Sequence, residues 1–583
     1  MATTQPTVGS GLASGFIART IEDPRERLVA RVAANLFREP NFYSTTDEKR
    51  QKLLQDLETV LTTHPEFIVQ LAYYTREKLN LRTTANFLLA FSAARKPTKK
   101  LLDRYFTAAV RLPTDLLEVV QFLQELSRKQ LPEGQCYVPT CLQRLVRHKF
   151  REFNIYQLGK YCSEGRRKHM SKKAAPTLTL AMKKLVRLCH ICEPADLVCS
   201  LLGKRYPETE EEFSTSSLAA MGRVFDPSQA HKRMKIPVPE TWETQVSAYG
   251  NKAEVWERLI KERKLPFVAM LRNLRNLLEA GVDRETHALV LARLQDPVQV
   301  AESRLFPFRF FSAFEALRVN QAALRPGKPL KPKKEPREVP RDLTNQYKAA
   351  LEAAVKLATV NNVQPILGHS VIFCDVSGSM EAQLSGGPMG SITNCMQAGV
   401  LLGLMLRYVC ESSEFIVFSS PGRHNKCWFP VELPKDGIRD DILGSMETVL
   451  KQGRENLGGG TDFPYDYVTG IINKHTHVDQ IFMFSDMMVS PGYEEFMGTQ
   501  TGGRLSVGSV LDQYRKQVNS GLKFVTVDLA CQAKNLLGAD YSDDYRNVQL
   551  WGYSDAILGL ASELQKSQIE AVEEAARELL SKS

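Results

Sequence analysis

The stretch that decides the fold of this 583-residue chain is Val371-Ile372-Phe373-Cys374-Asp375-Val376-Ser377-Gly378-Ser379-Met380. Its apolar first half predicts a buried strand, and the strand ends in the pattern Asp-x-Ser-x-Ser. A tight turn at the carboxyl end of the strand would therefore present one carboxylate and two hydroxyls. Hard oxygen ligands of this kind suit a divalent cation such as Mg²⁺, which keeps waters and leaves room for an oxygen from a partner. We therefore expect a cation site at this turn.

The sequence around this turn alternates between strand and helix patterns over about 230 residues. Such alternation predicts a doubly wound parallel sheet, in which ligands bind beyond the carboxyl ends of the strands. Asp375, Ser377 and Ser379 would lie at that edge. Besides the strand that ends at Asp375, we expect strands at 414–418, 480–484 and 523–529, and helices at 343–358, 394–409, 439–452, 466–474 and 509–518 and from about 555 onward.

Two further segments supply oxygen ligands at the same edge. Gly458-Gly459-Gly460-Thr461-Asp462 is a glycine-rich loop that can bring a hydroxyl close to a cation, and Ile481 to Asp486 is a strand that ends in a carboxylate. Together with the first turn, they resemble the von Willebrand factor A domain and its metal-ion-dependent adhesion site. The resemblance implies direct coordination by Ser377, Ser379 and Thr461, with Asp375 and Asp486 acting through water. The alternative is that the Ser/Asp cluster only hydrogen-bonds its own turns.

The resemblance also implies what the cation would do. Because the two carboxylates would contact the ion mostly through water, the ion would have few anionic groups bound to it directly. It would then take a Glu or Asp from a protein partner.

The amino-terminal half of the chain has a different pattern. From about Asp23 to Leu317 the apolar residues recur with helical period, and short turns with Pro, Gly or Asn separate the stripes. This organisation predicts an α-solenoid of helical hairpins with degenerate repeats. A linker at 324–342 follows, in which the stretch from Leu324 to Arg341 holds five prolines and seven Lys/Arg. We interpret it as a solvated connector or, alternatively, as a strap that contacts phosphates.

The net charge also changes sign close to this linker. Residues 1–345 contain 57 basic and 38 acidic residues, a net charge of +19, whereas residues 346–583 contain 19 basic and 28 acidic residues, a net charge of −9. A basic half attracts a polyanion and an acidic half does not. The densest basic stretch, from Arg144 to Arg187, has 13 Lys/Arg and two Glu, with Phe150, Phe153, Tyr156 and Tyr161 between them.

This basic stretch has two interpretations. Its charges and aromatics suit RNA, through phosphate contacts and base stacking. Alternatively, the aromatics are core residues of a helix and the Lys/Arg form its solvated face. We favour core positions for the aromatics and RNA contact for Arg166, Arg167, Lys168, Lys172 and Lys173.

Composition sets limits on the chain as a whole. No apolar run approaches the roughly 20 residues of a membrane span, so we expect no membrane partner. Residues 1–22 have the composition of a disordered tail rather than a secretory signal. The 11 scattered cysteines favour reduced thiols in the cytoplasm or nucleus. Cys189-His190-Ile191-Cys192 has zinc-ligand spacing but lacks a second pair, and we expect helix cysteines there instead.

Three helical segments resemble the TROVE module, named for the telomerase, Ro and vault proteins. They are Lys184-Leu185-Val186-Arg187-Leu188-Cys189-His190 followed by Pro194, then Leu265 to Leu274, and then Phe306 to Leu317. A TROVE module at 23–323 followed by an A domain at 343–583 is the order found in the Ro autoantigen and telomerase and vault protein component family. The resemblance implies a ring of helical hairpins that binds small noncoding or misfolded RNA.

Carried over residue by residue, the resemblance places Lys183, Lys184, Arg187 and His190 on the RNA-binding face. His190 could instead be a core or capping histidine, and Arg272 and Asn273 suit helix packing as well as RNA. We expect an RNA-binding component of a ribonucleoprotein particle, with Y-like, vault-like, telomerase or misfolded RNA as candidate ligands. A protein-only adaptor is the alternative. The sequence has no phosphate-binding loop and no hydrolase or metalloprotease motif, which argues against an enzyme.

Overall fold

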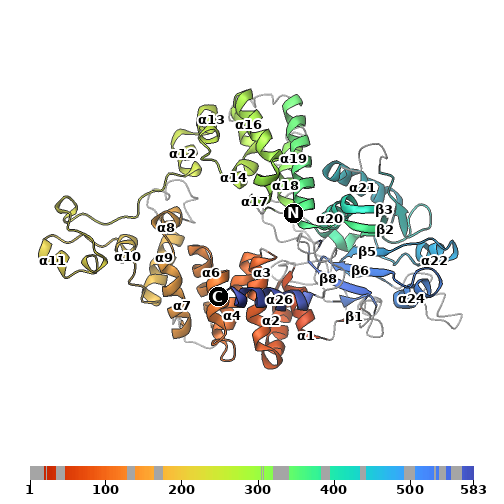
Figure 1. Ribbon diagram of the computed structural model, residues 1–583, viewed down its shortest axis with the longest axis horizontal. Coiled ribbons are helices and arrows are strands. Elements are labelled where there is room, and N and C mark those ends of the chain that lie inside the picture. Colours follow the sequence, from red (N-terminus) through yellow and green to blue (C-terminus); the bar gives the residue numbers. More distant parts are fainter. Residues whose placement is uncertain are drawn as a thin grey trace, which may run out of the picture. The chain divides into compact units, whose positions relative to one another are not determined.

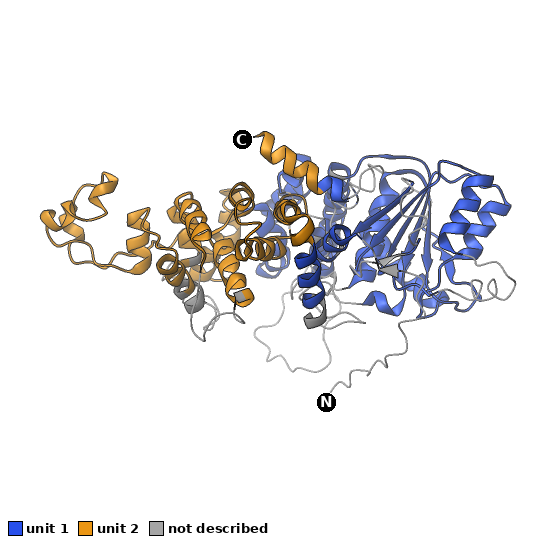
Figure 2. Ribbon diagram, turned by 90° about the horizontal axis from the view of Figure 1, so that it is seen from below, with its two compact units in different colours: residues 1–59, 266–571 blue, residues 60–265, 572–583 orange. Residues whose placement is uncertain are grey.

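The computed structural model describes residues 19–20, 23–33, 46–79, 81–127, 138–162, 175–303, 305, 307–319, 341–381, 394–433, 441–490, 506–530, 534–537, 546–552, 558 and 568–582 (Figure 1). The chain forms two compact units, coloured separately in Figure 2. The first comprises Met1–Thr59 and Pro266–Ala571, and the second comprises Val60–Leu265 and Val572–Ser583. Two of their three boundaries fall inside the helices α2 (Thr46–Thr63) and α26 (Gln568–Ser581), and the third lies between Leu265 and Pro266.

The first unit contains a six-stranded sheet with the strand order β4-β3-β2-β5-β6-β8. Every neighbouring pair is parallel except β3 and β4, so a short antiparallel strand closes one edge. The strands run from β2 (Ile366–Asp375) through β3 (Cys410–Phe418), β4 (Trp428–Pro430), β5 (Gln480–Ser485) and β6 (Lys523–Asp528) to β8 (Asn547–Trp551). The predicted doubly wound sheet is confirmed, with β4 and β8 as additional strands.

Helices cover both faces of this sheet. On one face, α22 (Tyr465–Asn473) and α24 (Val507–Gln517) share an apolar core with alternate residues of the strands, among them Phe373 and Met483. On the other face lies α20 (Cys395–Val409), followed in sequence by α21 (Ile442–Asn456). A Cβ atom at Gly403 would lie 2.6 Å from Sγ of Cys374, so glycine is what allows α20 to approach the sheet.

The first unit also contains helices from the amino-terminal half. A long helix, α19 (Arg341–Asn362), packs against α16 (Arg284–Gln295), α17 (Pro297–Ser303) and α18 (Pro307–Val319). A buried hydrogen bond of 2.6 Å joins Nδ1 of His287 to the hydroxyl of Tyr347. The shorter elements are α1 (Pro24–Ala33), α14 (Phe267–Arg272), α15 (Leu274–Ala280), η5 (Gly378–Glu381), and the paired strands β1 (Arg19–Thr20) and β7 (Lys534–Asn535).

The second unit is built from short helices, as the apolar stripes predict. Its buried polar centre is Asp115, which accepts hydrogen bonds from the backbone N–H groups of Arg111 and Leu112 and contacts Arg82 at 2.8 Å. The helices are α3 (Pro65–Glu77), α4 (Arg82–Ala94), α5 (Leu102–Ala109), α6 (Pro113–Ser127), α7 (Thr140–Arg151), α8 (Ile155–Cys162), α9 (Ala175–Leu188), α10 (Ala195–Leu202), α11 (Glu210–Ser214), η3 (Ala219–Met221), η4 (Pro227–Gln229), α12 (Trp242–Tyr249) and α13 (Ala253–Lys261).

The structure corrects one local expectation and leaves others open. Residues 189–192 were expected to be helical, but α9 ends at Leu188 because His190 adopts a left-handed φ of 52°. Phe150 and Phe153 are core residues, as favoured, whereas Tyr156 is exposed. The linker segment 320–340 and the start of the last predicted helix lie outside the described residues. Within the described ranges, no helix is both long and apolar enough to cross a membrane.

Candidate metal centre and cationic surface

The oxygen-bearing residues of the predicted metal site lie at the carboxyl edge of the sheet. Parallel pairing aligns Asp375 of β2 with Phe418 of β3, and Cys374 with Phe484 of β5, so Asp375 lies beside Ser485. The same edge receives the ends of β5 and β6, because Ser485 pairs with Asp528. Parallel pairing therefore brings together strand ends that are about 110 residues apart in the sequence.

The Asp-x-Ser-x-Ser turn holds its hydroxyls close together. Oδ1 of Asp375 accepts the N–H of Ser377 at 2.9 Å, and the Oγ atoms of Ser377 and Ser379 lie 3.2 Å apart. Adjacent ligands of an octahedral Mg²⁺ ion, with bonds of about 2.0–2.1 Å, are separated by roughly 3 Å. The spacing of the two hydroxyls therefore fits neighbouring positions around one small cation.

The glycine-rich loop packs directly against this turn. The N–H of Gly378 donates to the carbonyl of Gly459 at 2.8 Å, and the hydroxyl of Ser419 donates to the carbonyls of Gly458 and Gly460. A Cβ atom at Gly458 would lie 2.4 Å from Oγ of Ser420, so a side chain there would displace the loop. The loop ends in Thr461, whose side chain is buried next to the strand ends.

The second strand-terminal carboxylate belongs to the same cluster. Ser485 donates its hydroxyl to Oδ2 of Asp375 at 2.7 Å, and Asp486 accepts the N–H of Met488 at 3.0 Å. Burial and the neighbouring Asp486 carboxylate raise the pKa of Asp375 to about 7. All five predicted metal-site residues are buried, and the three segments that hold them converge. Two buried carboxylates beside paired hydroxyls are a donor set suited to a divalent cation.

Two polar residues at this edge were not among the predicted site residues. Ser485 orients Asp375, and Asp528, the fully buried last residue of β6, accepts the N–H of Ala530 at 3.1 Å. The sequence signal for both is a polar side chain at the end of an apolar strand. Their roles depend on strand order, which the sequence does not state.

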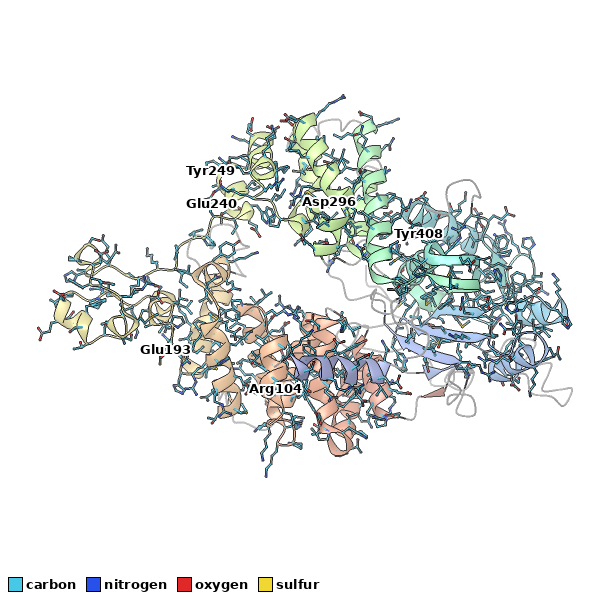
Figure 3. The ribbon with its side chains drawn as sticks, in the orientation of Figure 1. Arg104, Glu193, Glu240, Tyr249, Asp296 and Tyr408 are labelled. Atoms are coloured by element: carbon cyan, nitrogen blue, oxygen red, sulfur yellow. The ribbon has the colours of Figure 1, made fainter. Side chains whose placement is uncertain are left out.

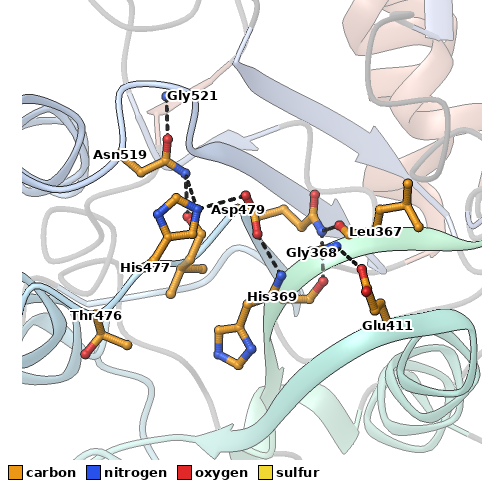
Figure 4. A network of polar contacts seen from close by, with 12 residues as sticks. Leu367, Gly368, His369, Glu411, Thr476, His477, Asp479, Asn519 and Gly521 are labelled. Atoms are coloured by element: carbon orange, nitrogen blue, oxygen red, sulfur yellow. Dashed lines mark hydrogen bonds and ion pairs between the residues drawn. The ribbon is translucent and has the colours of Figure 1, made fainter.

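The opposite end of the sheet has a separate polar network (Figure 4). Asp479 accepts the backbone N–H of His369 at 2.7 Å and contacts Nε2 of His477 at 3.1 Å. Gly368 has a φ of +81°, and a Cβ atom there would lie 2.2 Å from the Asp479 carboxylate. This network joins β2 to β5 at their amino ends, away from the carboxyl edge at which doubly wound sheets bind ligands.

The predicted RNA-binding residues divide into two groups. Lys183 and Lys184 are adjacent on α9, Arg187 follows them by four and three residues, and the exposed His190 lies in the turn after the helix. Lys184 and Arg187 are exposed, and Lys183 is half-buried. The other predicted residues, Arg166, Arg167, Lys168, Lys172 and Lys173, lie outside the described residues.

Two arginines of α7 extend this surface and were not singled out from the sequence. Nη2 of Arg151 contacts Oε2 of Glu193 at 3.0 Å; Figure 3 labels Glu193. Arg147 lies close enough to Cys189 for its charge to oppose the effect of burial, which raises the pKa of that thiol to about 12. The carboxyl-terminal half of α7 therefore lies beside the turn that follows α9. We call Arg147, Arg151, Lys183, Lys184, Arg187 and His190 the α7–α9 surface.

Other predicted site residues have structural roles. The side chain of Asn273 is buried, donates to the carbonyl of Ala269 at 2.8 Å and accepts from Asn276 at 2.7 Å, which supports its packing role. Cys189 is buried and Cys192 is exposed. Among the described residues, no group of three or more His, Cys, Asp or Glu is placed to hold a metal ion.

Comparisons with known proteins place these features in a family. The TROVE domain model matches residues 10–179 and 166–343. The chain is 29% identical over 590 residues to mouse telomerase protein component 1 and 28% identical over 579 residues to the rat protein, covering 82% and 80% of this chain. It spans about a fifth of the length of these relatives, 22% and 21%.

A solved structure agrees on the fold. The crystal structure of the RO (RSR) protein of Deinococcus radiodurans superposes with a TM-score of 0.52 at 17% sequence identity, covering 93% of this chain and 99% of that one. At this identity the likeness concerns the fold alone. The family match spans more than half of the chain, and a doubly wound sheet follows it. The chain therefore belongs to the TROVE-domain family, and a doubly wound α/β domain follows the matched region on its carboxyl-terminal side.

Proposed function

We propose that this protein is an RNA-binding component of a ribonucleoprotein particle, and that its α7–α9 surface contacts the RNA. The observation that supports this most is the clustering of six basic side chains from two helices and the turn between α9 and α10. The relatives that it matches are named telomerase protein component 1, and the solved structure that shares its fold is that of an RO protein. Small noncoding or misfolded RNA is the ligand class that this surface suits.

Helix α7 carries one buried cation that stabilises the fold and other cations that are exposed. Lys149 is buried, and its Nζ donates to the carbonyl of Thr107 at 2.9 Å and contacts Glu152 at 2.6 Å. Arg144 and Arg151 lie on the exposed side of the same helix. Phosphate contacts need exposed cations, because a buried and already bonded cation cannot reach the phosphate groups whose counterions it would replace. On α7 we therefore assign the exposed Arg151, and not the buried Lys149, to RNA contact.

His190 occupies a backbone position that normally favours glycine. The N–H of Ile191 donates to the carbonyl of Val186 at 2.9 Å, and the N–H of His190 donates to the carbonyl of Arg187 at 3.3 Å. These are the two hydrogen bonds of a Schellman motif, in which the left-handed residue after the helix is usually Gly. A histidine there, exposed and at a φ of 52°, is locally unfavourable. Contact between the His190 side chain and a ligand would explain why this position is not glycine.

Binding measured across a salt series tests this proposal. The variant Arg151→Gln with Arg187→Gln removes two exposed cations, and we expect its RNA affinity to fall at least about tenfold, with a slope of log affinity against log salt that is shallower by about two. The control is Arg423→Gln with Lys474→Gln, which removes two exposed cations from the A-type domain. An RNA affinity that is absent or indifferent to salt in the wild type contradicts the proposal and favours a protein-only adaptor.

We further infer that the A-type domain binds a divalent cation, Mg²⁺ being the best fit, through Ser377, Ser379 and Thr461, with Asp375 and Asp486 acting through water. The close pair of hydroxyls and the adjacent buried carboxylates support this ligand set. A bound cation would supply an open coordination position for a carboxylate of a protein partner. The residues of the chain would orient the ligands and keep the edge preorganised, chiefly through the hydrogen bond from Ser485 to Asp375.

Titration calorimetry with Mg²⁺ tests the cation site independently of RNA. Wild-type protein should bind one equivalent, and a peptide rich in Glu should bind more tightly when Mg²⁺ is present. A protein that binds no divalent cation would leave the Ser/Asp cluster as a purely structural hydrogen-bonding group.

A further inference from the structure

The segment that joins β3 to β4 is a local basic stretch in the acidic half of the chain. We call residues 419–427 the β3–β4 loop; it contains Arg423, His424 and Lys426 and no Asp or Glu. All three side chains are exposed, and none of them makes an ion pair with any residue that the structure describes. Because residues 346–583 carry a net charge of −9, this loop differs in sign from the domain around it. An exposed basic loop favours an anionic ligand.

The β3–β4 loop begins at the carboxyl edge of the sheet, where the predicted cation site lies. Its first residue follows Phe418, which pairs with Asp375. The N–H of Ser420 donates to the carbonyl of Gly460 at 2.7 Å, and Gly460 directly precedes Thr461, one of the predicted ligands. The base of the loop therefore adjoins the glycine-rich loop of the predicted site.

The tip of the β3–β4 loop is a tight turn that is fixed to the end of α21, which lies beside β3 (Figure 1). The N–H of Asn425 donates to the carbonyl of Gly422 at 3.2 Å, so Arg423 and His424 occupy the two central positions of a turn. The N–H of Arg423 donates to the carbonyl of Asn456 at 3.1 Å. A Cβ atom at Gly422 would overlap that carbonyl oxygen, so this close approach requires glycine. These contacts hold the tip in place before a ligand binds.

The turn itself does not require basic residues. Pro, Asp, Asn, Ser and Gly are the residues that favour tight turns, and a cation adds nothing to the turn geometry. Aromatic contacts orient two of the side chains. Nζ of Lys426 lies 4.7 Å from the centre of the Trp428 ring, and the ring of His424 stacks on Phe429 with centroids 6.4 Å apart. An aromatic ring carries no net charge, so the contact with Trp428 orients the ammonium group without neutralising it.

We propose that Arg423, His424 and Lys426 form a docking surface for an acidic peptide segment of a protein partner. The proposal rests on the proposed cation site and names the class of partner that the site would take. One carboxylate of the segment would reach the cation, and neighbouring carboxylates would contact the β3–β4 loop. Guanidinium and ammonium groups form charge-assisted hydrogen bonds with carboxylates, and the imidazole supplies a further donor.

A short acidic peptide fits this surface better than a nucleic acid does. The basic residues are confined to one loop, whereas the rest of residues 346–583 is acidic and repels an extended polyanion. A peptide segment can place its carboxylates on the loop and on the cation without covering that acidic surface. Charges at the rim of such a contact mainly increase the rate of association and the specificity.

The test measures binding of a fluorescein-labelled, Glu-rich peptide to the full chain, with Mg²⁺ and with a chelator. Arg423→Glu with Lys426→Glu should weaken peptide binding by about tenfold or more at low salt, mainly through slower association, and by less at high salt. Arg423→Gln with Lys426→Gln should cause a smaller loss, of about threefold.

The matched control is Lys474→Gln with Lys523→Gln, which removes two cations near the amino ends of β5 and β6 and should bind the peptide as the wild type does. Mg²⁺ affinity and melting temperature of the loop variants should stay close to those of the wild type, because the substituted side chains are exposed. A lower melting temperature in both loop variants would assign these cations a structural role and overturn the docking surface.

The possible results separate this inference from the proposed cation site. If the wild type binds Mg²⁺ and the peptide, and both loop variants match it in affinity and association rate, this inference is wrong and the cation site stands. If the wild type binds the peptide but no Mg²⁺, and the loop variants lose the peptide, the cation site fails and the docking surface stands. A wild type that binds no peptide in either condition refutes this inference, and Mg²⁺ titration then decides the cation site alone. A loss of RNA affinity in the loop variants would make the loop a nucleic-acid contact and overturn the acidic partner.

Discussion

The carboxyl edge of the sheet and the α7–α9 surface are both candidate binding sites, but they are built in opposite ways. At the sheet edge every predicted site residue is buried, and Asp375 accepts hydrogen bonds from the N–H of Ser377 and the hydroxyl of Ser485. On the α7–α9 surface Arg151, Lys184, Arg187 and His190 are exposed. The first site depends on angstrom-scale placement, and the second depends on the sum of several charges.

This difference predicts how each site responds to substitution. A buried cluster loses function sharply when one member is removed. The polar groups that bonded to the removed side chain are then left without hydrogen-bond partners in the protein interior. An exposed set of cations loses affinity in small, nearly additive steps, because each contributes one screened interaction. The predictions below test this contrast, beginning with the largest expected effect.

The largest effect is expected from removing both hydroxyls of the turn. Ser377→Ala with Ser379→Ala should lower the apparent Mg²⁺ affinity by more than about 100-fold, because both are expected to be direct ligands. The rise in melting temperature that Mg²⁺ causes in the wild type should disappear. RNA affinity should be unchanged, and equal loss of both activities would break the separation between the two sites.

A smaller effect is expected from the residue that orients Asp375. Ser485→Ala removes the 2.7 Å hydrogen bond to Asp375 and should lower Mg²⁺ affinity about 10- to 100-fold, as loss of a supporting contact usually does. Ser412→Ala is the matched control, because Ser412 contacts Nδ1 of His369 at 2.9 Å, in the part of the strands away from the metal edge. Equal Mg²⁺ affinities for these two variants would mean that Ser485 does not position the site.

A buried carboxylate in the first unit should make its stability depend on pH. Glu352 accepts the N–H groups of Ile442 and Leu443 at the start of α21, and burial raises its pKa from the usual 4.5 to about 7. A raised folded-state pKa stabilises the fold fully below pH 4.5, and this stabilisation is lost as the pH rises through about 7. The free energy of unfolding should therefore fall by about 1–3 kcal/mol over that interval.

Chemical denaturation at several pH values checks this dependence. Glu352→Gln keeps a hydrogen-bond acceptor but cannot ionise, so its unfolding free energy should vary less with pH than that of the wild type. An unchanged pH profile in the variant would exclude Glu352 as the source.

His190 offers a way to separate stability from binding on the exposed surface. His190→Gly places the favoured residue at a left-handed position and should keep or raise stability by up to about 1 kcal/mol, while RNA affinity falls. Thermal unfolding and RNA titration of the same preparation measure both quantities. A variant that loses stability and keeps RNA affinity would show that His190 is a structural cap.

The smallest effect is expected at the acid that neutralises Arg151. Glu193→Gln removes the partner of an exposed ion pair and should raise RNA affinity about twofold to fivefold at low salt, with the difference vanishing at high salt. Glu279→Gln is a matched control, because Glu279 also pairs with an exposed arginine, Arg275, at 2.7 Å. An equal gain for both variants would show that net charge, and not the α7–α9 surface, sets the affinity.

Much of this architecture was predictable because it depends on patterns of apolar and polar residues within single helices and strands. The apolar run before Asp375, the strands at 480–484 and 523–529 and the helix at 394–409 all form within a few residues of their expected bounds. The edge strand β4 was missed because three residues give too short a pattern. The turn at Cys189–Cys192 was assigned to a helix because a left-handed histidine has no signal in the apolar period.

The sequence by itself determined the chemistry of this protein: which oxygens could hold a cation, which segments are cationic, and the change from helical repeats to strand and helix alternation. Those properties depend on residue type and on the short spacing at which apolar residues recur in helices and strands. Only the tertiary structure decided which of these residues meet. Strand order placed Ser485 against Asp375, helix packing placed Arg147 and Arg151 beside the turn after α9, and packing of the β3–β4 loop placed Arg423 against the end of α21. Contacts between distant residues depend on register and packing, which no local pattern specifies.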